Sequence, residues 1–371
     1  MKFAYKIPPH IKAKSDTMTT MHIALAALLF VTAWAVMFQI LYFGTDYAIQ
    51  SLMVITAAVS SAFLTHILFH FFKTDGVKYK SFSQRLYSTL PKTWTGAPFI
   101  TALMIALMLP AGVPLYAVIV ATVFAEFFAK LVFGGLGNNI FNPAAVGVII
   151  AGFMLHSMLG ASAGAISSAG FAELAAGAGH NWRISTQQGL EFIDGYGGLF
   201  NIFFGSVRGG IGDTARFAVL IALVLLAWRK VIDWVVPLVF IGTVSAAAFL
   251  FGLYLGIGIF EIWYPILHIF SGALILCAVF MACDPVTTPI NRQGRIIFAI
   301  FLAMVTVIIR LNANHAEAVP FAILIMNMFV PYIDRKTSNV TTLSAGAKIA
   351  SMCGCFVFAV GFSVGLSVLL S

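Results

Sequence analysis

A glycine-rich segment at residues 133–147 joins two apolar runs and contains side chains able to bind a polar ligand. It reads Phe-Gly-Gly-Leu-Gly-Asn-Asn-Ile-Phe-Asn-Pro-Ala-Ala-Val-Gly and places Asn142 directly before Pro143. Glycine allows tight turns and close approach of a ligand to the backbone, and the Asn amide both donates and accepts hydrogen bonds. The segment could line a cofactor site, or it could be a tight connector with Pro143 at the start of a helix.

A second segment, residues 281–294, has the same character. It contains Asp284, Thr287 and Asn291 between two apolar runs. An Asp at a membrane boundary is a candidate functional residue, because a carboxylate is costly to place there. The alternative is that Asp284 only caps the first turn of a helix.

A third segment, residues 209–214, precedes another apolar run. Backbone N–H groups ahead of a helix favour the binding of an anion such as a phosphate. The segment could therefore hold a phosphate group, or it could be a flexible turn. Its candidate ligand-binding residues are Gly209, Gly210, Gly212, Asp213 and Thr214.

The composition shows where these segments must lie. Of the 371 residues, 61% are hydrophobic and 9% are charged, whereas soluble domains have about 45–50% and roughly 25%. The mean hydropathy is +0.99. So few charges cannot cover a soluble globule, which excludes a cytosolic enzyme and a disordered chain. Four cysteines do not make a disulfide framework. The net charge of +8 indicates basic cytoplasmic loops rather than nucleic-acid binding.

Continuous apolar runs predict an all-α polytopic membrane protein, because a β-barrel would show short alternating segments. Eleven spanning helices are predicted, at residues 22–44, 47–72, 97–115, 116–132, 144–159, 215–231, 235–256, 262–283, 296–310, 318–333 and 349–370.

The basic residues set the orientation of these helices. With the N-terminus in the cytoplasm, 17 of the 21 Lys and Arg residues fall on the cytoplasmic side, as the positive-inside rule requires. The three polar segments are then distributed over both sides. Residues 133–147 and 281–294 face the cytoplasm, and residues 209–214 end a long external loop.

The helices divide into two groups of five within one membrane domain, 1–371. The first half is 1–159, the external loop 160–214, the second half 215–336, and an extra C-terminal helix covers 346–370. Because each half has an odd number of helices, the halves have opposite topology, which is a frequent plan in transporters.

Two pairs of polar side chains lie within the predicted helices. Glu126 and Lys130 are one turn apart and either neutralise each other or serve ion passage. His66 and His70 are also one turn apart, near the cytoplasmic end of the second predicted helix. They are either histidines at the membrane–water interface or ligands of a haem or metal, although one helix supplies few ligands.

The ordered set of motifs resembles the D subunit of the Rnf electron-transport complex and, less closely, the B subunit of the sodium-pumping NADH:quinone oxidoreductase. The chain lacks the long N-terminal extension of the latter. The matching pieces are residues 134–144, 209–214, 268–273, 284–287 and 291–292, then Arg310, Asn327 and residues 330–334.

This resemblance implies a membrane subunit of a six-part complex that couples electron flow between reduced ferredoxin and NAD to Na⁺ or H⁺ movement. It implies partners in the other complex subunits, membrane lipid and a flavin transferase, within a bacterial cytoplasmic (inner) membrane. It also implies FMN, joined by a phosphoester to a threonine of the external loop, and a second, non-covalent flavin or a redox partner inside the membrane, near Asn142, Asp284, Thr287 and Asn291.

Thr186 is the best candidate for the FMN acceptor. The family motif begins with Asp and has small residues ahead of the threonine, whereas this chain has His180 and the pair Ile184-Ser185. Covalent FMN at Thr186 and an unmodified loop threonine therefore both stay open. A second similar stretch begins at Asp194 but ends in Leu199 and Phe200, which have no hydroxyl group.

Three functions remain at this point. The first is a flavin-holding, electron-transferring subunit coupled to ion transport, in which the cofactor supplies the redox chemistry. The second is a channel or transporter of the same inverted plan without redox function, and the third is a scaffold of the complex. No catalytic side chain and no metal ligand is predicted, so whether the chain is itself an enzyme stays open.

Overall fold

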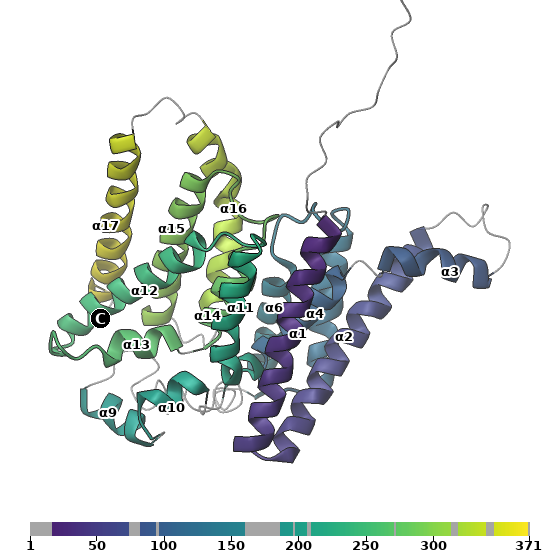
Figure 1. Ribbon diagram of the computed structural model, residues 1–371, viewed down its shortest axis with the longest axis horizontal. Helices are drawn as coiled ribbons and strands as arrows, with labels where there is room; N and C mark the ends of the chain where they lie inside the picture. Colours follow the sequence, from purple (N-terminus) through teal and green to yellow (C-terminus); the bar gives the residue numbers. More distant parts are fainter. Residues whose placement is uncertain are drawn as a thin grey trace, which may run out of the picture.

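The computed structural model describes residues 17–73, 82–93, 96–159, 186–195, 197–205, 209–270, 272–312, 318–338 and 345–369. Within these ranges every regular element is a helix, and the only strand-like pairing is an isolated antiparallel bridge between Pro110 and Gly210. The all-α prediction is confirmed (Figure 1).

Among the described residues, seven helices are long and apolar enough to cross a membrane. They are α1 (Thr17–Tyr42), α2 (Thr45–Lys73), the turn η3 (Ile211–Ala215) with α11 (Arg216–Trp228), α12 (Val235–Tyr254), α15 (Arg292–Asn312), α16 (Ala318–Ser338) and α17 (Ala345–Leu369).

The other predicted spans are shorter or broken. The predicted helix 97–115 is only α4 (Ala97–Met108), because Leu109 is extended and Pro110 has no N–H to continue the helix. The predicted helix 262–283 is divided into α13 (Trp263–Phe270) and a second piece, Leu274–Met281, which begins with α14 (Leu274–Leu276). The two pieces are bent by 64° relative to each other. Gly272 has a positive φ of 58° at this break, a conformation that glycine adopts without strain.

Two segments finish in a π-helical turn. Helix α5 (Leu115–Glu126) continues into η1 (Phe127–Leu131), and α14 continues into η4 (Cys277–Met281). A polar link and a long helix follow each turn: residues 132–142 lead to α6 (Pro143–Leu159), and residues 282–291 lead to α15. The two polar links, which are similar in sequence character, therefore also have matching local structure.

The first five spans and the later ones form two groups of helices that meet along the middle of the molecule (Figure 1). Helix α1 packs against η3 and α11, and α6 packs against α16. Ala35 of α1 and both Ala218 and Ala222 of α11 are buried. Small side chains let membrane helices approach closely, which increases packing contacts where the hydrophobic effect is absent.

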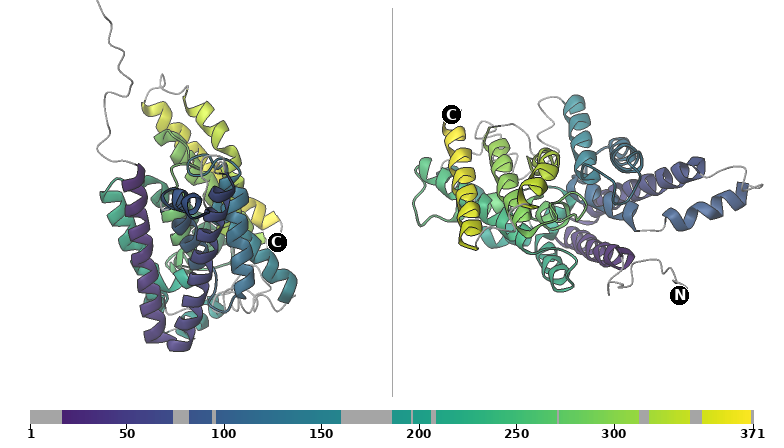
Figure 2. Two further views of the ribbon diagram at one scale, coloured as in Figure 1. Left: turned by 90° about the vertical axis from the view of Figure 1, so that its right-hand side faces the viewer. Right: turned by 90° about the horizontal axis from the view of Figure 1, so that it is seen from above.

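Three short helices lie outside this bundle. Helix α3 (Phe82–Thr93) extends to one side next to the end of α2, and α9 (Thr186–Gly195) and α10 (Leu199–Phe204) lie beneath the second group (Figures 1 and 2). The α1–α2 turn is at the same end as α9 and α10. The beginning of α1 and the end of α16 are at the opposite end (Figure 1). The sequence predicts that the first of these ends is external and the second cytoplasmic.

Candidate functional site

The two polar links come together at Asn142, which is 2% exposed. Its side-chain Oδ1 accepts hydrogen bonds from the N–H groups of Ala144, at 3.0 Å, and Ala145, at 3.3 Å. These groups belong to the first turn of α6, so Asn142 is an N-cap. Its Nδ2 donates to the carbonyl of Met281 at 3.4 Å, which connects the first link to the end of η4.

Asn327 on α16 bonds to both links. Its Oδ1 accepts the backbone N–H of Asn142 at 3.0 Å, and its Nδ2 donates to the carbonyl of Thr287 at 3.0 Å. Buried backbone groups away from regular structure require such partners. Sequence reasoning did not select Asn327 as a site residue, although an amide in the middle of an apolar helix was the available signal.

Asp284 organises the second link. One carboxylate oxygen accepts the N–H of Val286 at 3.2 Å, and the other accepts the hydroxyl of Thr287 at 3.2 Å. Asp284 lies beyond Met281, where the spanning segment ends. Burial raises the pKa of the Asp284 carboxyl, and the hydrogen bonds from Val286 and Thr287 oppose this rise.

The remaining residues of the predicted link site are more dispersed. Thr287 is buried. Asn291 is exposed, and its carbonyl accepts the N–H of Arg295 at the start of α15. Asn142, Asp284 and Thr287 are thus brought together, while Asn291 lies at the edge.

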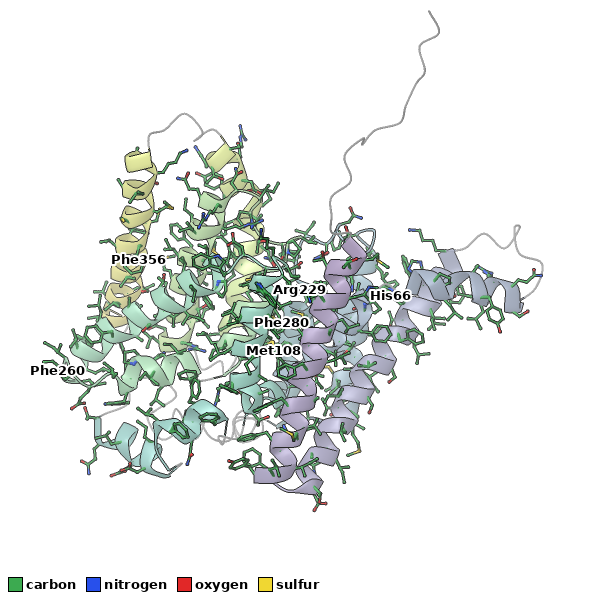
Figure 3. All side chains as sticks on the ribbon, in the orientation of Figure 1. His66, Met108, Arg229, Phe260, Phe280 and Phe356 are labelled. Atoms are coloured by element: carbon green, nitrogen blue, oxygen red, sulfur yellow. The ribbon has the colours of Figure 1, made fainter. Side chains whose placement is uncertain are left out.

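A cavity of about 110 Å³ lies between the links and is lined by Lys130, Asn142 and Asp284. Apolar side chains complete its wall, among them Met104 and Phe280. Figure 3 shows Phe280 near the middle of the molecule. Cofactor pockets usually measure about 300–1,000 Å³, so this cavity is too small for an isoalloxazine ring unless the links separate.

Lys130, on η1, holds its ammonium group in a fixed position beside this cavity. Its Nζ donates to the Ala97 carbonyl at 2.9 Å, the Thr101 hydroxyl at 3.0 Å and Glu126 Oε1 at 3.1 Å. The other oxygen of Glu126, Oε2, is 2.8 Å from His66 Nε2. The neutralising pair of Glu126 and Lys130 is present, and His66 joins it as a buried partner of Glu126.

The glycine-rich segment at residues 209–214 has a clear packing role. It crosses the end of α4, where the N–H of Ile211 donates to the Leu109 carbonyl at 2.9 Å. A Cβ atom at Gly210 would lie 2.8 Å from the Met108 carbonyl oxygen, and one at Gly212 would lie 3.0 Å from that of Leu107. Only glycine permits so close a crossing.

The hydrogen bonds of this segment leave little for a phosphate group. Asp213 Oδ2 accepts the N–H of Gly210 at 3.0 Å, the Asp213 N–H donates to the Gly210 carbonyl at 2.9 Å, and the Thr214 hydroxyl donates to the Ile211 carbonyl at 2.8 Å. Asp213 and Thr214 are buried. Anion binding at residues 209–214 stays a prediction. It would require these internal hydrogen bonds to be replaced by hydrogen bonds to the anion.

Thr186 is the first residue of α9 and is partly exposed. Helix α9 packs on α13 through Gly189, where an added Cβ atom would overlap the ring of Trp263. Helix α9, which Thr186 begins, lies at the same end of the molecule as the turn between α1 and α2, which the sequence predicts to be external (Figure 1). The motif residues ahead of it, at positions 180–185, lie outside the described residues.

Comparison with known proteins finds relatives that are subunits of ion-translocating oxidoreductase complexes. Residues 4–342 match the model of the NQR2, RnfD, RnfE family. The chain is 33% identical over 262 residues to the D subunit of the proton-translocating ferredoxin:NAD(+) oxidoreductase complex of Clostridium ljungdahlii, covering 66% of this chain and 74% of that protein.

Two further relatives extend this comparison. The D subunit of the Na(+)-translocating ferredoxin:NAD(+) oxidoreductase complex of Acetobacterium woodii is 28% identical over 349 residues, covering 92% of this chain and 96% of that protein. The B subunit of the Na(+)-translocating NADH-quinone reductase of Chromohalobacter salexigens is 30% identical over 244 residues, covering 64% of this chain and 57% of that protein.

Proposed function

Since the chain belongs to the NQR2, RnfD, RnfE family, we propose that it is the D subunit of an Rnf-type complex that couples electron transfer to ion transport. The observation that carries this proposal is the junction of Asn142, Asn327 and Thr287, which joins the two polar links beside a cavity. In inverted-repeat transporters, the binding region is typically formed where one membrane helix in each half is interrupted. Here the two interruptions are joined by buried polar side chains.

We further propose that Thr186 carries FMN through a phosphoester of its hydroxyl oxygen. The partial exposure of Thr186 leaves this group accessible to a flavin transferase. Its position at the first residue of α9 favours a phosphoester, because a helix N-terminus stabilises negative charge. When bound, the flavin would supply the electron-transfer chemistry, while the chain would fix its position at the external end.

In-gel flavin fluorescence of the denatured subunit tests this assignment. The chain is expressed with a flavin transferase, so that a covalent flavin remains attached during electrophoresis. Thr186→Ala should abolish the fluorescence because the acceptor hydroxyl is lost. The matched control Thr56→Ala removes an exposed hydroxyl on α2 and should keep the fluorescence. Unchanged fluorescence in Thr186→Ala would overturn the assignment.

The second, non-covalent flavin is proposed only for a state in which the links separate, because the cavity of about 110 Å³ is too small for it. Asn142 and Asp284 would then offer an amide and a carboxylate to the flavin ring. Flavin extracted by denaturation from the Thr186→Ala subunit would support this site. A wild-type subunit that holds only covalent flavin would remove it.

We place the chain in the bacterial cytoplasmic membrane, with its N-terminus inside and the other complex subunits as partners. Support comes from the sequence: with the N-terminus inside, 17 of the 21 Lys and Arg residues fall on the cytoplasmic side. Affinity purification of the tagged chain should recover five further subunits.

Recovery of the chain alone, with no flavin, would favour a channel or transporter of the same plan. A flavin-free chain whose deletion prevents assembly would instead be a scaffold.

A further inference from the structure

Three ionisable side chains form a buried cluster within the first half, which we call the triad: His66 on α2 with Glu126 and Lys130 at the end of α5 and in η1. Glu126 is 0% exposed, Lys130 3% and His66 4%. Burying ionisable groups among apolar helices costs several kcal/mol unless they are paired. Pairing explains how the triad is tolerated, but an apolar set of side chains could fill the same space at lower cost. Stability alone therefore does not account for the triad.

The triad has no position left for a metal cation. Each oxygen of Glu126 faces a nitrogen, Lys130 Nζ at 3.1 Å and His66 Nε2 at 2.8 Å. The nearby oxygens of Thr101 and Ala97 accept hydrogen bonds from the same Nζ. A hard cation such as Na⁺ needs several oxygen ligands directed at it, and here the ammonium group of Lys130 already occupies that position. The cation that the triad can still bind is a proton.

His66 has a free position for that proton. Its Nε2 faces Glu126, whereas its buried Nδ1 has no hydrogen-bond partner among the described residues. The ring of His70, one turn further along α2, has its centroid 5.8 Å from that of His66. His70 is partly exposed and lies toward the end of α2 assigned to the cytoplasm. A proton can therefore approach Nδ1 from that side.

The surrounding elements add little competing charge. Helix α4 contributes only the neutral Thr101 hydroxyl and the Ala97 carbonyl, and Pro143–Met154 of α6 contains no titratable side chain. Among the described residues, Asp284 lines the same cavity as Lys130 and interacts with it electrostatically. Helix α3, which packs against α2, adds Arg85, whose guanidinium lies over the Phe71 ring and donates to the Phe72 carbonyl. The triad is thus connected through Lys130 to the charge state of the cavity between the links.

We propose that the triad is a proton-loading site, filled from the cytoplasmic side, and that the ion handled by this chain is H⁺ rather than Na⁺. A proton binds to His66 Nδ1, and the proton on Nε2 moves to Glu126 Oε2. His66 ends as the neutral Nδ1–H tautomer, Glu126 as a neutral acid and Lys130 as an ammonium ion. The charge of the triad changes from zero to +1, and no other atom is exchanged.

Lys130 connects the triad to the redox chemistry, and this step rests on the proposed function. Negative charge that enters the cavity attracts the ammonium group and stabilises the loaded, positive triad, because interactions between charges are strong where water is excluded. Loss of that negative charge favours proton release. The arrangement therefore couples proton uptake to the charge of a group held between Asn142 and Asp284.

The first test measures proton uptake directly on the purified subunit. Infrared difference spectra between acidic and alkaline buffer should show the C=O stretch of a buried neutral carboxyl group, shifted in D₂O. Glu126→Gln should remove this signal, and His66→Gln should weaken it. Asp46→Asn, at an exposed site in the first turn of α2, is the matched control and should keep it. A spectrum of Glu126→Gln identical to the wild type would overturn the proposal.

The second test uses inverted membrane vesicles that contain the complete complex. The Gln side chain of His66→Gln can still donate to Glu126 but cannot relay a proton. Protons moved per electron should fall by roughly tenfold, while electron transfer changes by less than about twofold. The control His22→Gln replaces an exposed histidine on α1 and should leave both unchanged. Unchanged proton movement in His66→Gln, or ²²Na⁺ uptake without proton movement in the wild type, would refute the proposal.

These tests separate the two proposals. If the chain is not part of a redox complex, vesicles lacking it will still show electron-driven ion transport, and the proposed function fails. The infrared signal of Glu126 does not depend on the complex, so it decides whether the triad binds a proton even in that case.

Discussion

The backbone N–H of Asn142 donates to Oδ1 of Asn327 at 3.0 Å, across 185 residues of sequence. Because Asn327 also donates to the carbonyl of Thr287, one amide on α16 holds both polar links in a fixed relative position. Any motion that separates the links, including one that opens the cavity, must break at least one of these two bonds.

Asn327→Ala should therefore destabilise the protein. It leaves the buried N–H of Asn142 and the buried carbonyl of Thr287 without partners, and each such loss costs about 1–3 kcal/mol. Thermal unfolding in detergent measures the effect as a lower Tm. Asn138→Ala is the control, because Asn138 is exposed and makes only a 3.5 Å contact with the Gly134 carbonyl. An equal Tm for the two variants would show that the junction contributes nothing.

Asp284 should make stability depend on pH. Because burial raises the pKa of Asp284 in the folded state, its contribution is fully present below the unfolded pKa of about 3.9 and is lost as the pH rises through the folded pKa. Asp284→Asn keeps a side-chain carbonyl for the Val286 N–H but cannot ionise. We expect the Tm of the wild type to fall relative to that of Asp284→Asn as the pH is raised from about 4 toward 7. Parallel curves would contradict this expectation.

The glycine at position 205 should be far less tolerant of substitution than the one at position 242. Gly205 has a φ of 99°, and an added Cβ atom would lie 2.6 Å from the Thr214 carbonyl oxygen. Gly205→Ala should cost about 1–3 kcal/mol through backbone strain alone. Gly242 lies inside α12 with nothing within 4 Å of an added Cβ atom, so Gly242→Ala should be neutral or stabilise by about 0.5–1 kcal/mol. The difference in Tm between the two variants measures this contrast.

Much of this arrangement could be predicted from sequence because its signals are local. Apolar runs define the spanning segments, and the spacing of Glu126 and Lys130 places them on one helix face. The contact between His66 and Glu126 joins residues 60 apart in the chain, so no periodicity predicts it. The partners of Asn327 also lie far from it in the chain, so no periodicity predicts those contacts either. The break between α13 and α14 was hidden because Ser271 and Gly272 sit within a run that is apolar on average, and hydropathy does not detect backbone conformation.

The last prediction concerns the orientation of the chain, on which the cytoplasmic loading of the triad depends. In a variant without its four cysteines, Lys336→Cys at the end of α16 and Glu261→Cys between α12 and α13 place single thiols at exposed positions. With the N-terminus inside, an impermeant maleimide should label Glu261→Cys in intact spheroplasts and Lys336→Cys only in inverted vesicles. The opposite result would place His70 at the outer surface, and the triad would then take its proton from outside.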